Sequence, residues 1–257
     1  TENIAYKRRR FEMLLEFEAE KESQLARIEE LKSEGLFNDL VEESRGKFKS
    51  SEYNEGEGGE LISYCINEDV LHAPKILSKL KLKTNNEDYV KGADGVHLLK
   101  LDDSTYEVIF AESKMYKDLK QAVNKAFESI DRFISGDAID FEITTLATNL
   151  SGEFEDIDAD FISKYILPSK SNVTHHTAFS IFIGFNIDND LDKSLDYKVY
   201  EQQMVDKVRK AIHDEVDHIS SKVSDPNRRA YSFYIYLIPF ENIEDFRKDI
   251  IKGVKGE

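Results

Sequence analysis

The chain is poor in cysteine, in positive charge and in long apolar runs, and each shortage excludes a class of protein. Its 257 residues include one Cys and carry 35 Lys+Arg against 51 Asp+Glu, a formal net charge of −16. The single Cys65 cannot form an intrachain disulfide. No apolar run approaches the roughly 18 residues of a membrane-spanning helix, and residues 1–14 have no signal-peptide pattern. We therefore expect a cytoplasmic protein without a membrane-spanning helix.

Several catalytic and binding motifs are also missing. No GxSxG or HExxH pattern occurs, and no helix-turn-helix or zinc-finger motif is evident. The glycine-rich segment 51–59 is followed by Glu60-Leu61 and not by the Lys-Ser or Lys-Thr of a phosphate-binding P-loop. The negative charge itself opposes nucleic-acid binding, since that affinity comes mostly from Lys and Arg beside phosphates. The charge fits either simple solubility or a partner that holds the nucleic acid.

The most informative stretch is residues 92–114, GADGVHLLKLDDSTYEVIFAESK. Two strand-like runs flank a turn at 102–104 and predict a β-hairpin, which would bring Asp94 and Glu112 to the same end. Glu112 and Lys114 lie two residues apart, so they point to the same face of their strand. Two carboxylates and one ammonium can hold a divalent cation beside a positive charge, an arrangement that suits phosphodiester hydrolysis.

Chance offers an alternative origin for this pattern, because acidic residues are abundant in the chain. The context adds weight to the catalytic interpretation. Tyr106–Ala111 is a largely apolar run, yet it leads directly into Glu112, a residue that is costly to bury without a partner.

At these residues the chain resembles the PD-(D/E)xK, or restriction-endonuclease-like, nucleases, with Gly92-Ala93-Asp94 and Glu112-Ser113-Lys114 as the matching segments and Ala93 in place of the proline. Gly59-Glu60-Leu61, Gly95-Val96-His97 and Met115-Tyr116 extend the likeness. Together these segments are similar to the nuclease subunit of the Hachiman anti-phage defence system, the DUF1837 family.

The resemblance implies a metal-dependent DNA endonuclease with a restriction-endonuclease-like core. It implies Mg²⁺, with Mn²⁺ as a substitute, bound by Asp94, Glu112, the Ser113 carbonyl and Glu60, with Lys114 as the catalytic cation. It also implies a helicase subunit that restrains the nuclease. The partner surfaces that we expect are residues 51–59 and the chain after about residue 150.

Two features of the sequence can each be interpreted in two ways. Glu60 opens a helix predicted over Glu60–Leu71, so it either stabilises the helix dipole or supplies the third carboxylate that the resemblance implies. The segment 75–83 contains Lys75, Lys79, Lys81 and Lys83 and is either a solvated face or a phosphate-binding track. Cys65 lies among apolar neighbours and is predicted to be a core residue.

The chain as a whole predicts an α/β fold with a mixed central sheet flanked by helices. Residues 1–50 are predicted as a helical N-terminal extension, and residues 51–257 as the nuclease domain with a C-terminal α/β elaboration. Seven elements are expected after the hairpin. They are a helix at 118–134, a strand at 141–148, a short helix at about 157–166, a buried strand at 178–187, a long helix at 196–222, a buried strand at 230–240 and a final helix at 241–252.

A second hypothesis comes from a different class of protein. The chain could be a catalytically inactive interaction module that keeps the nuclease fold, its carboxylates forming only a solvated strand end. A working site must bring Asp94 and Glu112 together with Lys114 beside them, whereas an inactive module leaves them splayed or salt-bridged.

Overall fold

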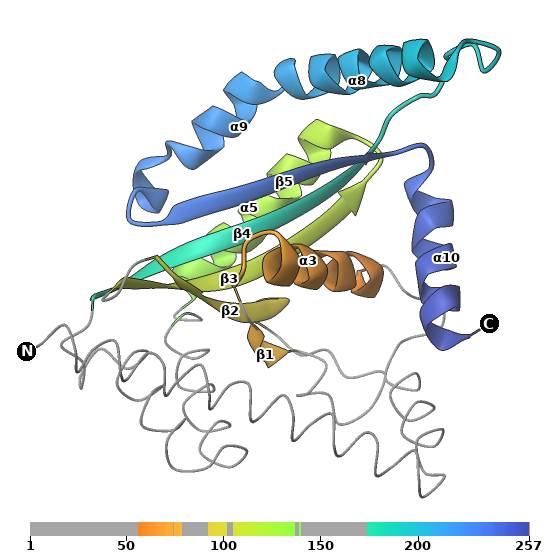
Figure 1. Ribbon diagram of the computed structural model, residues 1–257. Helices are drawn as coiled ribbons and strands as arrows, with labels where there is room; N and C mark the ends of the chain where they lie inside the picture. Colours follow the sequence, from red (N-terminus) through yellow and green to blue (C-terminus); the bar gives the residue numbers. More distant parts are fainter. Residues whose placement is uncertain are drawn as a thin grey trace, which may run out of the picture. The chain divides into compact units, whose positions relative to one another are not determined.

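The computed structural model describes residues 56–73, 75–78, 92–101, 105–136, 139 and 174–256. This part of the chain forms a five-stranded sheet in the order β1-β2-β3-β4-β5 (Figure 1). The strands are β1 (Lys75–Ser78), β2 (Gly95–Lys100), β3 (Thr105–Tyr116), β4 (Thr174–Asn186) and β5 (Ser232–Phe240). β1, β2 and β3 pair antiparallel, whereas β3, β4 and β5 pair parallel. The predicted extension at 1–50, the turn at 102–104, the strand at 141–148 and the helix at about 157–166 lie outside the described residues.

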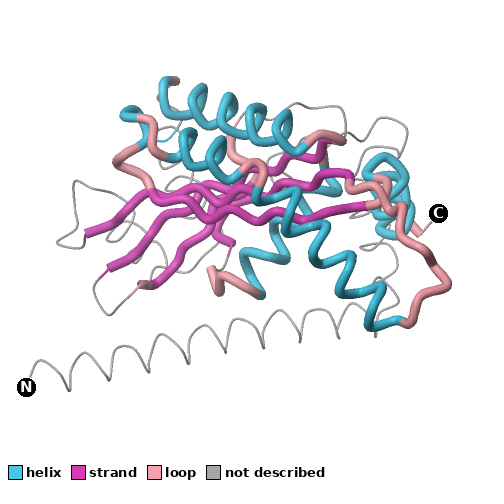
Figure 2. Tube along the Cα trace, turned by 90° about the horizontal axis from the view of Figure 1, so that it is seen from above, coloured by secondary structure: helices cyan, strands magenta, loops and turns pink. Residues whose placement is uncertain are grey.

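Helices cover both faces of this sheet (Figures 1 and 2). They are α3 (Glu57–Asp69), α5 (Leu119–Ser135), α8 (Tyr197–His213), α9 (Val216–Val223) and α10 (Ile243–Lys255), with a short 3₁₀ helix at Pro226–Arg228. α5 packs on one face of β3 and β4, and α3 and α10 pack on the other. The predicted α/β fold with a mixed, helix-flanked sheet is confirmed and is consistent with a restriction-endonuclease-like core.

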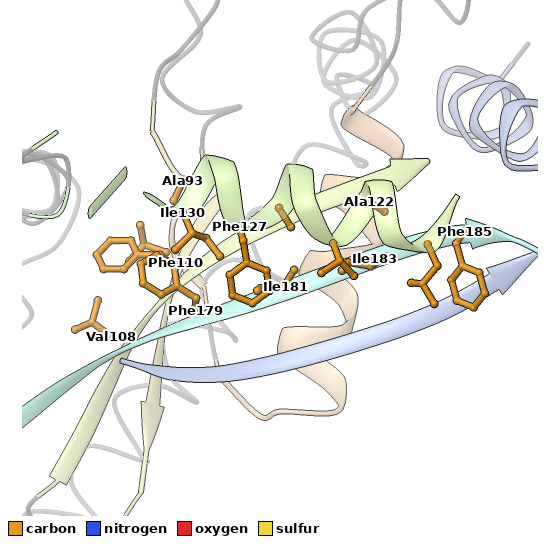
Figure 3. Close-up of a cluster of buried hydrophobic side chains, with 14 of the residues drawn as sticks. Ala93, Val108, Phe110, Ala122, Phe127, Ile130, Phe179, Ile181, Ile183 and Phe185 are labelled. Atoms are coloured by element: carbon orange, nitrogen blue, oxygen red, sulfur yellow. The ribbon is translucent and has the colours of Figure 1, made fainter. Parts of the chain in front are cut away.

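The α5 face of the sheet holds the main hydrophobic core (Figure 3). Asp118 caps α5, because its side chain accepts a hydrogen bond from the Gln121 N–H at 2.7 Å. Apolar residues then recur every three or four positions and bury the inner side of the helix, as the predicted helix at 118–134 requires. They pack on aromatic and branched side chains of β3 and β4, including Phe110, Phe179 and Ile181.

The α3 face is built differently. Gly59, Ser63 and Asn67, spaced four residues apart, form the buried inner side of α3. A Cβ on Gly59 would lie 3.3 Å from Met115 and from Ser113 Oγ, so glycine lets the helix approach the sheet closely. The prediction that the loop extends to residue 59 is therefore wrong, because this packing outweighs the roughly 1 kcal/mol cost of a helical glycine.

Cys65 is exposed, and its prediction as a core residue is wrong. Its apolar neighbours Ile62 and Ile66 do face the sheet. The α3 turn directs residue 65 away from the sheet, since residues 59, 63 and 67 define the inner side. The apolar neighbours of Cys65 in the sequence therefore did not indicate which side of this weakly amphipathic helix is buried.

Two predictions for the C-terminal part need correction. The helix expected at 196–222 is two helices, because the chain turns at Asp214-Glu215, where the Glu215 N–H bonds the Ile212 carbonyl at 3.0 Å. The turn lets α9 pack beside α5, with Ile219 and Val223 against the core. The strand expected to be buried at 230–240 is β5, which is only partly buried because it ends the described sheet.

Candidate metal-dependent active site

The candidate site lies where β2 begins and β3 continues past it. Gly95 is the first residue of β2 and pairs with Ala111, and the Asp94 N–H donates to the Ala111 carbonyl at 2.9 Å. β3 runs on to Tyr116 and does not end at residues 112–114 as the sequence suggested. In the described part of the chain, residues 112–116 therefore have a strand neighbour on the β4 side and none on the β2 side.

Asp94 extends the ladder with its side chain. Its Oδ2 accepts hydrogen bonds from the Ser113 N–H at 2.8 Å and from the Ser113 hydroxyl at 3.0 Å. In an antiparallel strand the N–H and C=O of one residue point to the same edge, so the Ser113 carbonyl also faces the β2 side. Asp94 and the Ser113 carbonyl therefore lie beside each other on the β2 side of β3. The predicted hairpin places Asp94 at this end of β3.

Glu112 and Lys114 share one face of β3, as their spacing predicts, and form a half-buried ion pair. The Lys114 ammonium also donates to the Ser113 carbonyl at 3.2 Å. Burial lowers the pKa of Lys114, but the Glu112 carboxylate, with help from Asp94 and Tyr116, raises it above its ordinary value. Lys114 is thus a fixed positive charge on which the oxygens of Glu112 and Ser113 converge.

Glu60 enters the site from α3. It lies in the first turn of that helix, where a carboxylate also interacts favourably with the helix dipole, so its two possible roles are compatible. The carboxylates of Glu60 and Asp94 both act electrostatically on the ammonium of Lys75 and raise its pKa against the larger effect of burial. Close packing at Gly59 holds this end of α3 against β3.

Lys75 is a site residue that the sequence identified only as one of four lysines. It is partly buried, and its ammonium lies 4.9 Å from the centroid of the Tyr64 ring. Burial lowers the pKa of this ammonium, and the carboxylates of Glu60, Asp94 and Glu68 offset only part of that effect. A solvated face is therefore the wrong description for Lys75, while Lys79, Lys81 and Lys83 lie outside the described residues.

His97 is a second residue whose role the sequence did not predict. It is completely buried, and its Nδ1 lies 2.9 Å from the Ala73 carbonyl oxygen. Burial lowers the pKa of His97 to about 4, the Ala73 hydrogen bond opposes this, and the nearby Lys75 charge lowers it further. The neutral ring donates from Nδ1, and its buried Nε2 makes no hydrogen bond with the described residues.

The donor set of this site is chemically suited to Mg²⁺. Carboxylates and a backbone carbonyl are the hard oxygen ligands that this ion takes, and no sulfur or imidazole ligand is needed. The Glu112 carboxylate and the Ser113 carbonyl already converge on one cation, the Lys114 ammonium. Among the described residues, no group of three or more His, Cys, Asp and Glu side chains is arranged to hold a metal ion.

Comparison with known proteins assigns the chain to a family. The model of the HamA family matches residues 11–254, which is nearly the whole chain. No curated protein and no solved structure matches the chain. In the part of the chain that the structure describes, no helix is long and apolar enough to cross a membrane.

Proposed function

This chain belongs to the HamA family, the A subunit of the Hachiman anti-phage defence system, and on that premise we propose that it is a metal-dependent DNA endonuclease. The observation that carries the proposal is the meeting of Asp94, from the entry of β2, with Ser113 and the Glu112–Lys114 pair of β3. Residues of both signs are brought to one strand edge from two segments of the chain. This is the arrangement that phosphodiester hydrolysis with a divalent ion requires.

Each residue has a defined task in this proposal. Asp94, Glu112, the Ser113 carbonyl and Glu60 would hold Mg²⁺ or Mn²⁺, which supplies Lewis acidity and lowers the pKa of water. Lys114 remains charged beside Glu112 and stabilises the negative charge that develops on the phosphate. Ser113 fixes Asp94 through its N–H and hydroxyl, so the carboxylate is oriented before the substrate binds.

Plasmid cleavage tests these assignments. Asp94→Ala, Glu112→Ala and Lys114→Ala should each lower Mg²⁺-dependent cleavage by about 100- to 1,000-fold or more, because each removes a ligand or the stabilising charge. Glu60→Ala should lower it less. Glu128→Ala is the matched control, since Glu128 forms a similar pair with Lys125 on the exposed side of α5. Wild-type cleavage by the folded Glu112→Ala protein would refute the assignment.

The alternative is a catalytically inactive module of the same family. One observation favours it: Glu112 is salt-bridged to Lys114, and a solvated or structural pair needs no metal. The same assay separates the two functions when it is run on the chain alone and on its complex with the helicase subunit. No Mg²⁺-dependent cleavage in either preparation would favour the inactive module.

The proposal includes restraint by a helicase partner in the cytoplasm. An unrestrained nuclease would damage the host, and no motif for reading a DNA sequence is evident in the chain. The net charge of −16 also opposes DNA binding by the chain alone. We expect the isolated chain to bind duplex DNA no better than the micromolar range of non-specific binding at moderate salt. Nanomolar binding in a fluorescence-anisotropy titration would contradict this expectation.

A further inference from the structure

We propose that Lys75 is a phosphate-binding residue of this site, whose ammonium contacts a non-bridging oxygen of the DNA backbone beside Asp94. The inference rests on the proposed nuclease function and assigns it a second cation from a different strand. Lys114 belongs to β3, whereas Lys75 begins β1, on the other side of β2.

Backbone geometry directs this side chain into the site. Lys75 pairs with His97 in the ladder, and a β-bulge lies between Lys75 and Leu77. A Cβ built on Gly95 would lie 2.9 Å from Lys75 Cε and 3.3 Å from Lys75 Nζ. The end of the lysine side chain therefore lies directly against Gly95 of β2, in the space that a side chain at position 95 would fill. The second glycine of the Gly92–His97 segment thus has a physical role.

The ammonium is available to a ligand. With the described residues, Lys75 Nζ makes no ion pair and no hydrogen bond, and its close neighbour is the Tyr64 ring at 4.9 Å. The backbone N–H of Lys75 is the group that bonds Glu68, at 2.6 Å. Lys114, by contrast, is occupied by Glu112 and Ser113. Tyr64 is 37% exposed, so the ammonium lies near the surface where a duplex can approach.

Electrostatics requires a cation of this kind. A DNA phosphate that enters the site meets the carboxylates of Glu60, Asp94 and Glu112, which repel it. The Lys75 ammonium interacts electrostatically with the first two of these carboxylates and offsets part of their field before any metal is bound. The Nε2 atom of His97 lies 3.3 Å from the position that a Cβ on Gly95 would take, and it makes no hydrogen bond with the described residues. The neutral His97 ring can accept a hydrogen bond through Nε2 and does not repel the Lys75 ammonium, so Lys75 remains oriented toward the site.

Salt-dependent DNA binding tests the role without requiring catalysis. The affinity of the full chain for a fluorescein-labelled 20-base-pair duplex is measured in EDTA over a series of salt concentrations, with EDTA removing any metal contribution. Loss of one phosphate contact lowers the slope of log K against log salt by about 0.9. Lys75→Met should show this loss, and Lys75→Arg should restore the slope. Lys210→Met, at an exposed lysine of α8, is the matched control and should leave the slope unchanged.

Gly95→Ala supplies an independent test, because its methyl group displaces the Lys75 stem and leaves the charge in the chain. It should lower the slope like Lys75→Met, and it should have no further effect in the Lys75→Met background. Thermal unfolding of each variant verifies that it is folded.

Three results would overturn the proposal: an unchanged slope in Lys75→Met, a full Gly95→Ala effect in the Lys75→Met background, or no measurable duplex binding by the wild type at low salt. Failure of the wild type to cleave DNA with Mg²⁺ would instead refute the nuclease function. The slope measured in EDTA still decides the role of Lys75 in that case.

Discussion

The two faces of the central sheet are built from different chemistry. The α5 face contains aromatic and branched side chains, among them Phe110, Phe127 and Phe179 (Figure 3). The α3 face has a smaller apolar cluster around Met115, Phe182 and Ile243 and, in addition, several small and polar residues. Among the described residues, its buried polar side chains with an atom that lacks a hydrogen-bond partner include Ser63, Asn67, His97 and Ser180. The α5 face therefore stabilises the fold, whereas the α3 face contains buried polar groups that lower the stability of the protein.

The difference follows from what each face must position. Ser113 and Lys75 lie on the α3 side, where α3 packs closely on β3 and the Lys75 side chain lies against Gly95 of β2. Small residues permit both approaches, and buried polar groups are their cost, since each unsatisfied group is unfavourable by about 1–3 kcal/mol. Departures from ideal packing are expected to gather at functional sites for this reason.

The largest effect is expected on the α5 face. Phe127→Ala should lower the free energy of unfolding by about 3–5 kcal/mol, because the fully buried ring packs against Phe233 and the Arg228 guanidinium and leaves a cavity when removed. Urea denaturation of the purified chain measures this change. A loss below about 1 kcal/mol would show that the α5 face is not the main source of stability.

The second effect tests the polar face through pH. His97 has a folded-state pKa of about 4, below the ordinary value of 6.5, so the unfolded chain binds more protons between these values. The contribution of neutral His97 to the free energy of unfolding is thus fully present above about pH 6.5. It is lost as the pH drops toward 4, which lowers the free energy of unfolding by about 3 kcal/mol. His97→Gln cannot titrate and should lack this part of the pH dependence, although Lys75 remains beside it. If the free energy of unfolding depended on pH equally in the wild type and in His97→Gln, the lowered pKa of His97 would be refuted.

The smallest effect compares two neighbouring residues of β4. Ser180 faces α3, and its hydroxyl has no hydrogen-bond partner among the described residues, whereas Ile181 faces α5. Both residues are fully or almost fully buried. Ser180→Ala should change the free energy of unfolding by less than about 1 kcal/mol or raise it, because no hydrogen bond is lost. Ile181→Val should lower it by about 0.5–1.5 kcal/mol. If Ser180→Ala destabilised the chain more than Ile181→Val, the contrast between the faces would be wrong.

The sequence identified most of the candidate site because its spacing is local. Two-residue alternation put Glu112 and Lys114 on one face, and the hairpin brought Asp94 to β3. The helix at 118–134 was also predictable, because a strong 3.6-residue pattern and the Asp118 cap agree. This helix could be predicted without knowledge of its contacts with the sheet.

The remaining features depended on contacts between distant segments. The exposure of Cys65, the turn at Asp214-Glu215 and the partial burial of β5 follow from what each element packs against. Lys75 could not be separated from the other lysines of its segment, because its position is set by Gly95 and a β-bulge. Residue spacing along one strand fixes which side chains share a face, whereas the approach of α3 and β1 to that strand is a property of the folded core. The sequence by itself therefore determined the carboxylates and Lys114, and only the tertiary structure decided which further residues stand beside them.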